Sequence, residues 1–274
     1  MKIVSFNVNS VRQRLHQLQS VVDKHSPEFI GLQETKVQDH EFPVDAIAEI
    51  GYQIIYTGQK THYGVALMSR LPCSDPCYGF PGDSEDAQKR FIGGEYQLDG
   101  QSVLVFNGYF PQGESRDHPI KFPAKQRFYQ DLIQFLGAYD MTRSNLIVMG
   151  DYNIAPQDLD IGIGADNAKR WLKTGKTSFL PEERGWFQEL EALGLHDGFR
   201  LCHADIDDRF SWFDYRSRGF EREPKRGLRI DHLMVSEQLK SRVVDAGVDY
   251  DIRGMEKPSD HAPTWIELNL VDRV

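Results

Sequence analysis

The stretch Asn145-Leu146-Ile147-Val148-Met149-Gly150-Asp151-Tyr152-Asn153 predicts a buried strand that delivers polar side chains from its carboxyl end. Gly150 gives the backbone room to approach a ligand or another strand, and residues two apart on an extended chain point the same way. Asp151 and Asn153 therefore share a face, which suits a phosphoester or metal site. Because Asp and Asn also favour turns, this stretch alone fits a simple cap of the next turn about equally well.

The composition is that of a single folded domain. A chain of 274 residues with 40% hydrophobic residues can bury a sizeable core, and no linker or repeat divides it, so we expect one catalytic domain over residues 1–274. The amino terminus is too polar for a secretory signal and no apolar run is long enough to span a membrane, so we expect a cytoplasmic protein. An odd number of cysteines, three, argues against a disulfide scaffold.

The charge of the chain is segregated. The formal net charge is −9, which is unusual for a nucleic-acid enzyme, yet the segment 169–176 carries four positive charges and no acid, and the segment 216–229 has a net charge of +4. Each cluster alone fits a solvated face. Together they favour a polyanionic partner with rings to stack on, because aromatic residues lie within or beside them. These residues are Trp171, Trp212, Phe213 and Tyr215.

Two further predicted strands also end in polar side chains. The strand 2–8 ends near Asn7, a helix is predicted over 11–25, and the strand 29–34 ends at Glu34. This strand, helix, strand unit places Asn7 and Glu34 at equivalent ends, where ligands gather in α/β folds. From this segment alone, an ordinary surface carboxylate is slightly favoured for Glu34.

The remaining pattern predicts a layered fold. Residues 52–109 are rich in β signals and include the hairpin turn Asp99-Gly100, while 119–139 and 181–193 have helical periodicity. Hairpins combined with strand, helix, strand units imply sheets packed on sheets with helices outside. The segment from Asn153 to Lys176 is expected to be rich in loops, and 209–213 is expected to be a strand.

Asp231 is an acid inside an apolar run, and a buried carboxylate is costly without a partner. His261 offers that partner. A carboxylate bonded to one imidazole nitrogen fixes the tautomer and leaves the other nitrogen to face a substrate. The two residues are distant in sequence, so only the fold can bring them together.

Several motifs carry a family resemblance. In chain order they are Ser5-Phe6-Asn7-Val8-Asn9, Gly31-Leu32-Gln33-Glu34, Asn107-Gly108-Tyr109-Phe110-Pro111-Gln112-Gly113, Gly150-Asp151-Tyr152-Asn153, Arg209-Phe210-Ser211-Trp212-Phe213-Asp214-Tyr215-Arg216, Arg229-Ile230-Asp231 and Ser259-Asp260-His261. In this order the chain resembles the exonuclease III family of apurinic/apyrimidinic endonucleases, within the endonuclease/exonuclease/phosphatase superfamily.

The resemblance implies a four-layered α/β sandwich, with two packed mixed sheets flanked by helices and the active site at one edge. It implies a DNA-repair phosphodiesterase that cuts the backbone 5′ to abasic sites in duplex DNA and has 3′-to-5′ exonuclease and 3′-phosphodiesterase activities. The implied cofactor is magnesium, with manganese as a substitute. The implied partner is double-stranded DNA with abasic sites or blocked 3′ ends. The protein is expected to act as a monomer and not to associate with a membrane.

The resemblance also assigns residues. The implied catalytic residues are Tyr109, Asp151, Asn153, Asp231 and His261, with Asp151 acting on either the attacking water or the leaving oxygen. The implied metal site and its surroundings comprise Asn7, Glu34, Asp151, Asn153, Asp260 and His261. The implied DNA contacts are Arg90, Gln112, Lys121, Trp212 and Phe213.

One departure from the family pattern is His232, which follows Asp231 where an apolar residue is more usual. We expect it to be an inert strand residue that faces outward, and the alternative is a modifier of the Asp231–His261 pair. Two other functions fit parts of the pattern: a phosphatase of inositol lipids or small phosphoesters, and a DNA-binding module without catalysis.

Overall fold

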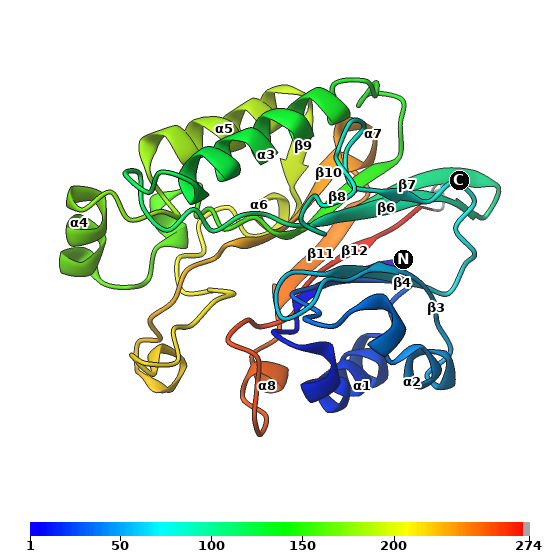
Figure 1. Cartoon of the computed structure of the whole chain (residues 1–274), viewed down its shortest axis with the longest axis horizontal. Helices are drawn as coiled ribbons and strands as arrows, with labels where there is room; N and C mark the ends of the chain where they lie inside the picture. The colour runs from blue at the N-terminus through cyan, green and yellow to red at the C-terminus, as the bar shows by residue number, and fades with distance from the viewer. Residues whose placement is uncertain (271–274) are drawn as a thin grey trace.

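Two mixed sheets, each with one parallel pair of strands at its centre, pack against each other in the middle of the molecule (Figure 1). The computed structural model describes residues 1–270, and within that range each sheet has six strands. The first sheet has the order β11 (Val243–Val248), β12 (Thr264–Leu268), β1 (Lys2–Asn7), β2 (Phe29–Gln33), β4 (Val65–Ser69) and β3 (Gln53–Thr57). The second has the order β5 (Cys77–Tyr78), β6 (Phe91–Leu98), β7 (Gln101–Tyr109), β8 (Leu146–Asp151), β10 (Asp231–Ser236) and β9 (Leu195–Asp197).

Helices cover the outer faces of both sheets (Figure 1). The first sheet packs on α1 (Leu15–His25) and α2 (Val44–Glu49), and the second packs on α3 (Lys121–Leu136) and α5 (Pro181–Ala192). One apolar core lies between the sheets and one lies under each helical layer, so the predicted four-layered α/β sandwich is confirmed. The shorter helices are α4 (Ala165–Lys173), α6 (Gly198–Cys202), α7 (Glu237–Lys240) and α8 (Tyr250–Arg253). A search of the described residues for a helix able to cross a membrane finds none.

The two parallel pairs bring four strand ends to one edge. In the first sheet Asn7 lies beside Gln33, and in the second Tyr109 lies beside Asp151. Gly150 is required where β7 and β8 meet: its φ is +151°, and a Cβ there would lie 2.0 Å from the carbonyl oxygen of Gly108. The close approach expected of Gly150 is therefore to a neighbouring strand.

Two predicted segments differ from the structure. The stretch expected to be loop contains α4, in which no residue is fully buried and only Ala168 and Trp171 pack on a core cluster, so the apolar pattern that predicts a helix is short. The strand expected over 209–213 is replaced by isolated bridges, in which Trp212 pairs with Leu228 and with His261. The irregular backbone turns Trp212 towards the strand ends.

A buried amide joins the two sheets. Asn107 of β7 is fully buried, and its Nδ2 donates to the carbonyl oxygens of Leu32 and Ala66, each at 2.9 Å, in the opposite sheet. Its Oδ1 accepts a hydrogen bond from Gln33 Nε2 at 2.6 Å. These bonds fix the position of one sheet over the other next to the edge where the strands end.

We expect Asn107→Leu to lower the free energy of unfolding by about 1–3 kcal/mol, because the Gln33 amide then loses its buried partner. Urea unfolding followed by circular dichroism measures the loss. The exposed strand residue Gln53 supplies the control Gln53→Ala, and equal stability of the two variants would show that the amide does not hold the sheets together.

Helices α1 and α8 anchor the segment that contains His261. Gln17 of α1 donates to Ile252 O at 2.7 Å and accepts from Ser259 N at 3.0 Å. Asp249, which caps α8, accepts from His25 Nε2 at 2.7 Å and from Lys24 Nζ at 2.9 Å. Burial alone raises the pKa of Asp249, but the bonds from His25 and Lys24 outweigh it and lower the pKa to about 2.

A depressed carboxyl pKa stabilises the folded state above the pKa of the unfolded chain, about 4, and this stabilisation is lost as the pH falls towards 2. We therefore expect the stability difference between the wild type and Asp249→Asn to be constant near neutral pH and to shrink between about pH 4 and pH 2. Chemical unfolding at several pH values tests this. A difference that does not change over that range would contradict the assignment.

Candidate active site

The carboxyl ends of the four parallel strands supply the first side chains of the site. Asn7 ends β1, Glu34 follows β2, Tyr109 ends β7 and Asp151 ends β8. Glu34 has a left-handed backbone with φ of +52°, which turns the chain away from the strand direction directly after β2. The site is thus built where the two sheets meet.

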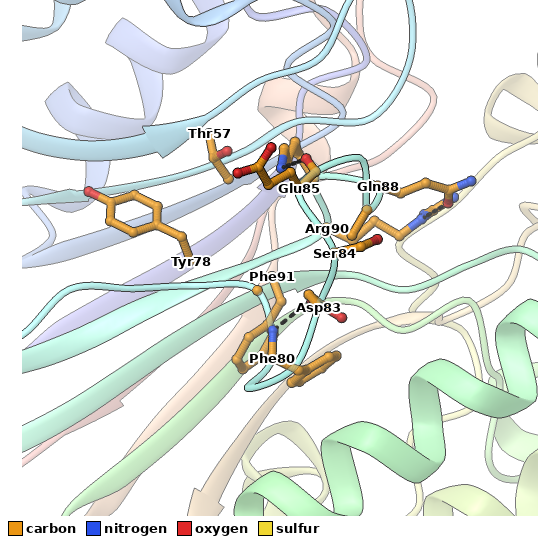
Figure 2. A pocket seen from close by; sticks show the side chains of 12 residues that line it. Thr57, Tyr78, Phe80, Asp83, Ser84, Glu85, Gln88, Arg90 and Phe91 are labelled. Atoms are coloured by element: carbon orange, nitrogen blue, oxygen red, sulfur yellow. Dashed lines mark hydrogen bonds between the residues drawn. The ribbon is translucent and has the colours of Figure 1, made fainter.

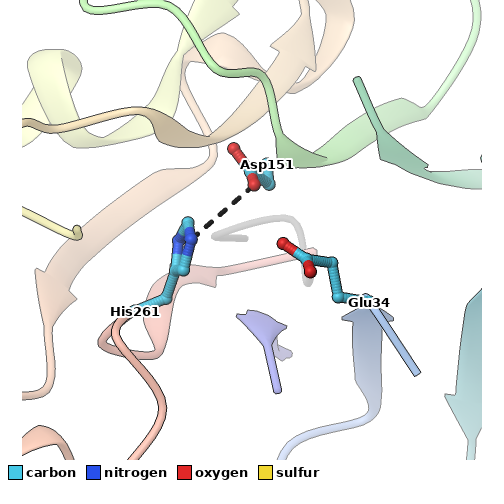
Figure 3. Close-up of side chains that lie close together, drawn as sticks. All are labelled: Glu34, Asp151 and His261. Atoms are coloured by element: carbon cyan, nitrogen blue, oxygen red, sulfur yellow. Dashed lines mark ion pairs between the residues drawn. The ribbon is translucent and has the colours of Figure 1, made fainter. Parts of the chain in front are cut away.

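Glu34, Asp151 and His261 converge at this edge (Figure 3). Each offers one ligand atom, and these atoms all lie within 4.8 Å of one another. The Nδ2 of Asn7 lies between the acids, donating to Glu34 Oε1 at 3.0 Å and to Asp151 Oδ2 at 2.9 Å. One amide therefore links a carboxylate beside the first sheet to a carboxylate of the second.

The structure also brings Asp231 and His261 together. His261 Nδ1 lies 2.8 Å from Asp231 Oδ2, and its Nε2 lies 3.8 Å from Asp151 Oδ2. Asp231 and Asp151 lie directly opposite each other on the antiparallel strands β10 and β8. The imidazole therefore lies between two acids on adjacent strands.

The protonation of these groups is set by burial and by their neighbours. Burial lowers the pKa of His261, but the carboxylates of Asp231 and Asp151 outweigh it and raise that pKa well above its usual value. Burial raises the pKa of Asp151, and Asp231 and Glu34 raise it further. Burial also acts to raise the pKa of Glu34, but the Lys36 ammonium at 2.8 Å reverses this effect and lowers it. The environment thus separates a charged Glu34 from a proton-binding Asp151.

A cavity of about 230 Å³ opens onto these groups. Tyr109, Gln112, Asn153 and Trp212, to which the resemblance assigns contacts with the phosphate and the DNA, line this cavity. Asn153 has φ of +53°, and its Nδ2 donates to Phe110 O at 3.0 Å. Burial raises the pKa of the Tyr109 phenol, so this hydroxyl stays neutral and can donate a hydrogen bond.

Asp260 lies beside the cluster and orients Trp212. Its Oδ2 accepts from the indole nitrogen of Trp212 at 3.1 Å, and its Oδ1 accepts from Asn9 Nδ2 at 2.8 Å. No role was predicted for Asn9, although it lies two residues beyond Asn7 in the same motif. Lys176, Ser178 and Trp171 also line the cavity and were not singled out as site residues.

Arg90 lies behind Tyr109. Its guanidinium carbon is 4.2 Å from the ring centre of Tyr63 and 4.7 Å from that of Tyr109, and its Nη1 donates to Tyr109 O at 3.0 Å. Figure 2 shows Arg90 at the wall of a separate cavity, formed by residues 78–91 with Thr57. Arg90 is buried, so its contacts support Tyr109 rather than a surface contact with DNA.

Two other expected DNA contacts lie outside the cavity. The Phe213 side chain is fully buried against the rings of Phe220 and Tyr250, so the structure does not support a contact with DNA. Lys121 is exposed at the start of α3 and pairs with Glu114 at 2.5 Å. A sequence motif does not show which of its aromatic residues faces inward.

His232 is buried, which corrects the expectation that it faces outward. Successive residues of a strand face opposite sides, so His232 points to the helical layer while Asp231 points to His261. Its Nδ1 lies 3.1 Å from Arg229 Nη1, and its Nε2 lies 2.8 Å from Ile154 O. Nδ1 also lies 3.5 Å from Asp197 Oδ2, so the ring anchors β10 within a buried polar network behind the site.

Residues 4–261 match the Endonuclease/Exonuclease/phosphatase family. The chain is 54% identical to Exodeoxyribonuclease III of Haemophilus influenzae, an alignment that covers 98% of this chain and all of the relative. It is similar to a 3′-5′ exonuclease of Neisseria meningitidis (TM-score 0.88, 38% identity) and to an AP endonuclease of Archaeoglobus fulgidus (TM-score 0.88, 32% identity), each alignment covering 98% of this chain and 100% of the other.

The fold and the edge where its strands end define a member of the endonuclease/exonuclease/phosphatase family, and the chain belongs to it. Within that family it is similar to exonuclease III over 98% of its length, as the resemblance implied.

A buried ion pair supports the cavity from behind. Lys125 of α3 and Glu183 of α5 have no exposed side-chain surface, and Lys125 Nζ lies 2.6 Å from Glu183 Oε1. The ammonium also donates to Asn153 O at 2.9 Å, and Glu183 Oε2 accepts from Ser178 N and Leu180 N, each at 2.8 Å. The pair therefore holds the backbone of two cavity-lining residues, Asn153 and Ser178.

We expect Lys125→Met to lower the free energy of unfolding by about 3–5 kcal/mol, because Glu183 then stays buried without its counter-charge. Urea unfolding measures this loss. The matched control is Lys121→Met on the same helix, whose exposed partner Glu114 remains solvated, so stability should hardly change. The ion pair would not be a structural support if both variants unfolded at the same urea concentration.

Proposed function

We propose that the protein is a DNA-repair phosphodiesterase that hydrolyses the backbone 5′ to abasic sites in duplex DNA and removes nucleotides and blocking groups from 3′ ends. The observation that carries the proposal is the convergence of Glu34, Asp151 and His261 in a cavity walled by Trp171 and Trp212. The relatives support it: one is named an exodeoxyribonuclease, one an AP endonuclease, and a third, from Neisseria, a 3′ phosphatase bound to a DNA product.

The donor set fits a divalent metal, and we propose magnesium, with manganese able to replace it. Magnesium prefers oxygen ligands and keeps several waters, so the carboxylates of Glu34 and Asp151 suffice. When bound, the ion neutralises negative charge on the phosphate oxygens and activates water. His261 is held by Asp231 through Nδ1, and its Nε2 lies 3.8 Å from Asp151 Oδ2, so this nitrogen is placed to face the substrate or the metal.

The side chains of the site divide the chemistry among them. We assign Asp151 to proton exchange with the attacking water or the leaving 3′ oxygen, because its carboxylate lines the cavity 3.8 Å from His261 Nε2. The His261 imidazolium, held by Asp231, donates to the phosphate as its negative charge grows. The Tyr109 hydroxyl and the Asn153 amide are the remaining donors for the phosphate. Asn7 holds the two carboxylates in place.

The surroundings of the cavity suit a nucleic acid. Lys176 and Trp171 come from one of the basic segments and Trp212 lies beside the other, so a lysine and two indole rings line the cavity although the chain is acidic overall. Cations that bind phosphates and rings that stack on sugars or bases together suit a strand of DNA better than a small phosphoester.

We further propose that the protein acts as a monomer in the cytoplasm. The proposed catalytic side chains all come from one chain, and the three cysteines are free thiols, as is usual in reducing compartments. Sedimentation of the protein in the presence and absence of DNA tests the oligomeric state.

A duplex oligonucleotide with one abasic site should be cut on the 5′ side of that site with magnesium and stay intact with a chelator. Asp151→Asn should lower kcat by about 10²–10⁴-fold, the usual contribution of a proton-transfer group. Product sizes on a denaturing gel measure both. The exposed turn residue Asp99 supplies the control Asp99→Asn, expected to cut normally. An uncut strand in the presence of magnesium would contradict the proposal. So would inositol phosphates that compete with DNA for the site and are themselves hydrolysed.

A further inference from the structure

A second cavity of about 230 Å³ adjoins the catalytic cavity. The two share three residues, Trp171, Lys176 and Trp212, which form a common wall between them. The catalytic carboxylates and His261 line only the first cavity. Whatever occupies the second cavity therefore lies next to the reacting groups without touching them.

The second cavity is lined by four cations and one acid. The cations are Arg170, Lys176, Arg222 and Arg226, and the acid is Asp214. Two of the acid's acceptor positions are already taken by backbone N–H groups, from Arg216 to Oδ1 and from Ser217 to Oδ2. The excess of positive charge fits an anion better than a neutral base.

Two of these cations keep their donors free. Within residues 1–270, the Lys176 ammonium and the Arg226 guanidinium donate no hydrogen bond and form no ion pair, whereas Arg170 bonds Asn167 and Arg222 bonds Ser217 O. Free donors on both sides of one cavity suit an oxyanion with several acceptor oxygens.

Lys176 is also held in place. Its Nζ lies 3.8 Å from the ring centre of Trp171, and that ring stacks on Phe179 with 5.6 Å between centres and 5° between planes. Its backbone N–H donates to Trp171 O at 2.9 Å, and its strand-like bridge to Ser115 fixes the other side of the segment. A cation seated on a packed indole is placed at the common wall before any ligand arrives.

We propose that the second cavity binds the phosphate on the 3′ side of the abasic sugar, with Lys176 as its principal contact. The proposal rests on the proposed function. A sugar within a strand carries one phosphate on its 5′ oxygen and another on its 3′ oxygen. With the attacked phosphate at Asp151 and the sugar along Trp212, the strand continues past the common wall, so the next phosphate enters the second cavity.

The experiment compares two duplexes that differ by one charge. Both contain a tetrahydrofuran abasic analogue, and in one the linkage 3′ to it is an uncharged methylphosphonate. For the wild type we expect the neutral linkage to raise KM about tenfold with little change in kcat, since one charge-assisted contact is lost and the reacting groups are untouched. For Lys176→Gln we expect the same high KM on both duplexes. For Lys176→Arg we expect the difference in KM between the two duplexes to be restored.

Lys240→Gln, on helix α7 and outside both cavities, is the control for a general loss of positive charge and should behave as the wild type. The inference is overturned if the wild type has the same KM for both duplexes, or if Lys176→Gln still discriminates between them, which would place Lys176 on another part of the DNA. Failure of the wild type to cut either duplex would instead refute the proposed function. Thermal unfolding of each variant separates a binding defect from a folding defect.

Discussion

The site depends on one amide that joins two carboxylates across the meeting line of the sheets. Asn7 donates to both Glu34 and Asp151, which would otherwise repel each other at close range. Burying carboxylates is costly, and the cost is met by placing Lys36 beside Glu34 and His261 beside Asp151. Each acid thus has one neutral donor in common and one cation of its own. This unequal division of charge lets the two acids take different roles, one as a permanent anion and one as a group that exchanges protons.

Buried charged groups also support the residues around the acids. Lys125 and Glu183 hold the backbone of Asn153 and Ser178, and Arg90 lies between the rings of Tyr63 and Tyr109. Further back, Arg229 bonds Asp160 at 2.7 Å and Asp197 at 2.7 Å below the start of β10. Such pairs contribute little to stability compared with apolar packing, but they fix orientation, because each partner accepts only a few geometries. The cavity wall is therefore held by directional contacts where its shape has to be exact for chemistry.

Much of the fold and of the chemistry of the site could be predicted from the sequence. The features that could not be predicted have a physical reason. Apolar runs that end in Asn7, Glu34, Tyr109 and Asp151 predicted where the polar groups gather, because the carboxyl ends of parallel strands lie together. The burial and facing of individual side chains could not be predicted from the sequence. Arg90 and Phe213 are buried, His232 faces the helices, and Lys176 lies on a cavity wall, since each position depends on packing between segments that are distant in the chain. The helix α4 was missed because its few apolar residues stand among charged ones and only Ala168 and Trp171 pack on the core, so the helical pattern in the sequence is short.

Asp231 and Asp151 lie opposite each other on neighbouring strands, so the arrangement of the active-site residues depends on the number of residues in β8 and β10. A strand has a period of two, so a single residue inserted within β10 would turn Asp231 to the helical side and bring His232 to the position beside His261. A residue inserted within β8 would turn Asp151 away from His261 in the same way. Changes in loop length have no such effect. Divergence within this architecture should accordingly be tolerated between the strands and suppressed inside these two, where one added residue would remove a carboxylate from the site.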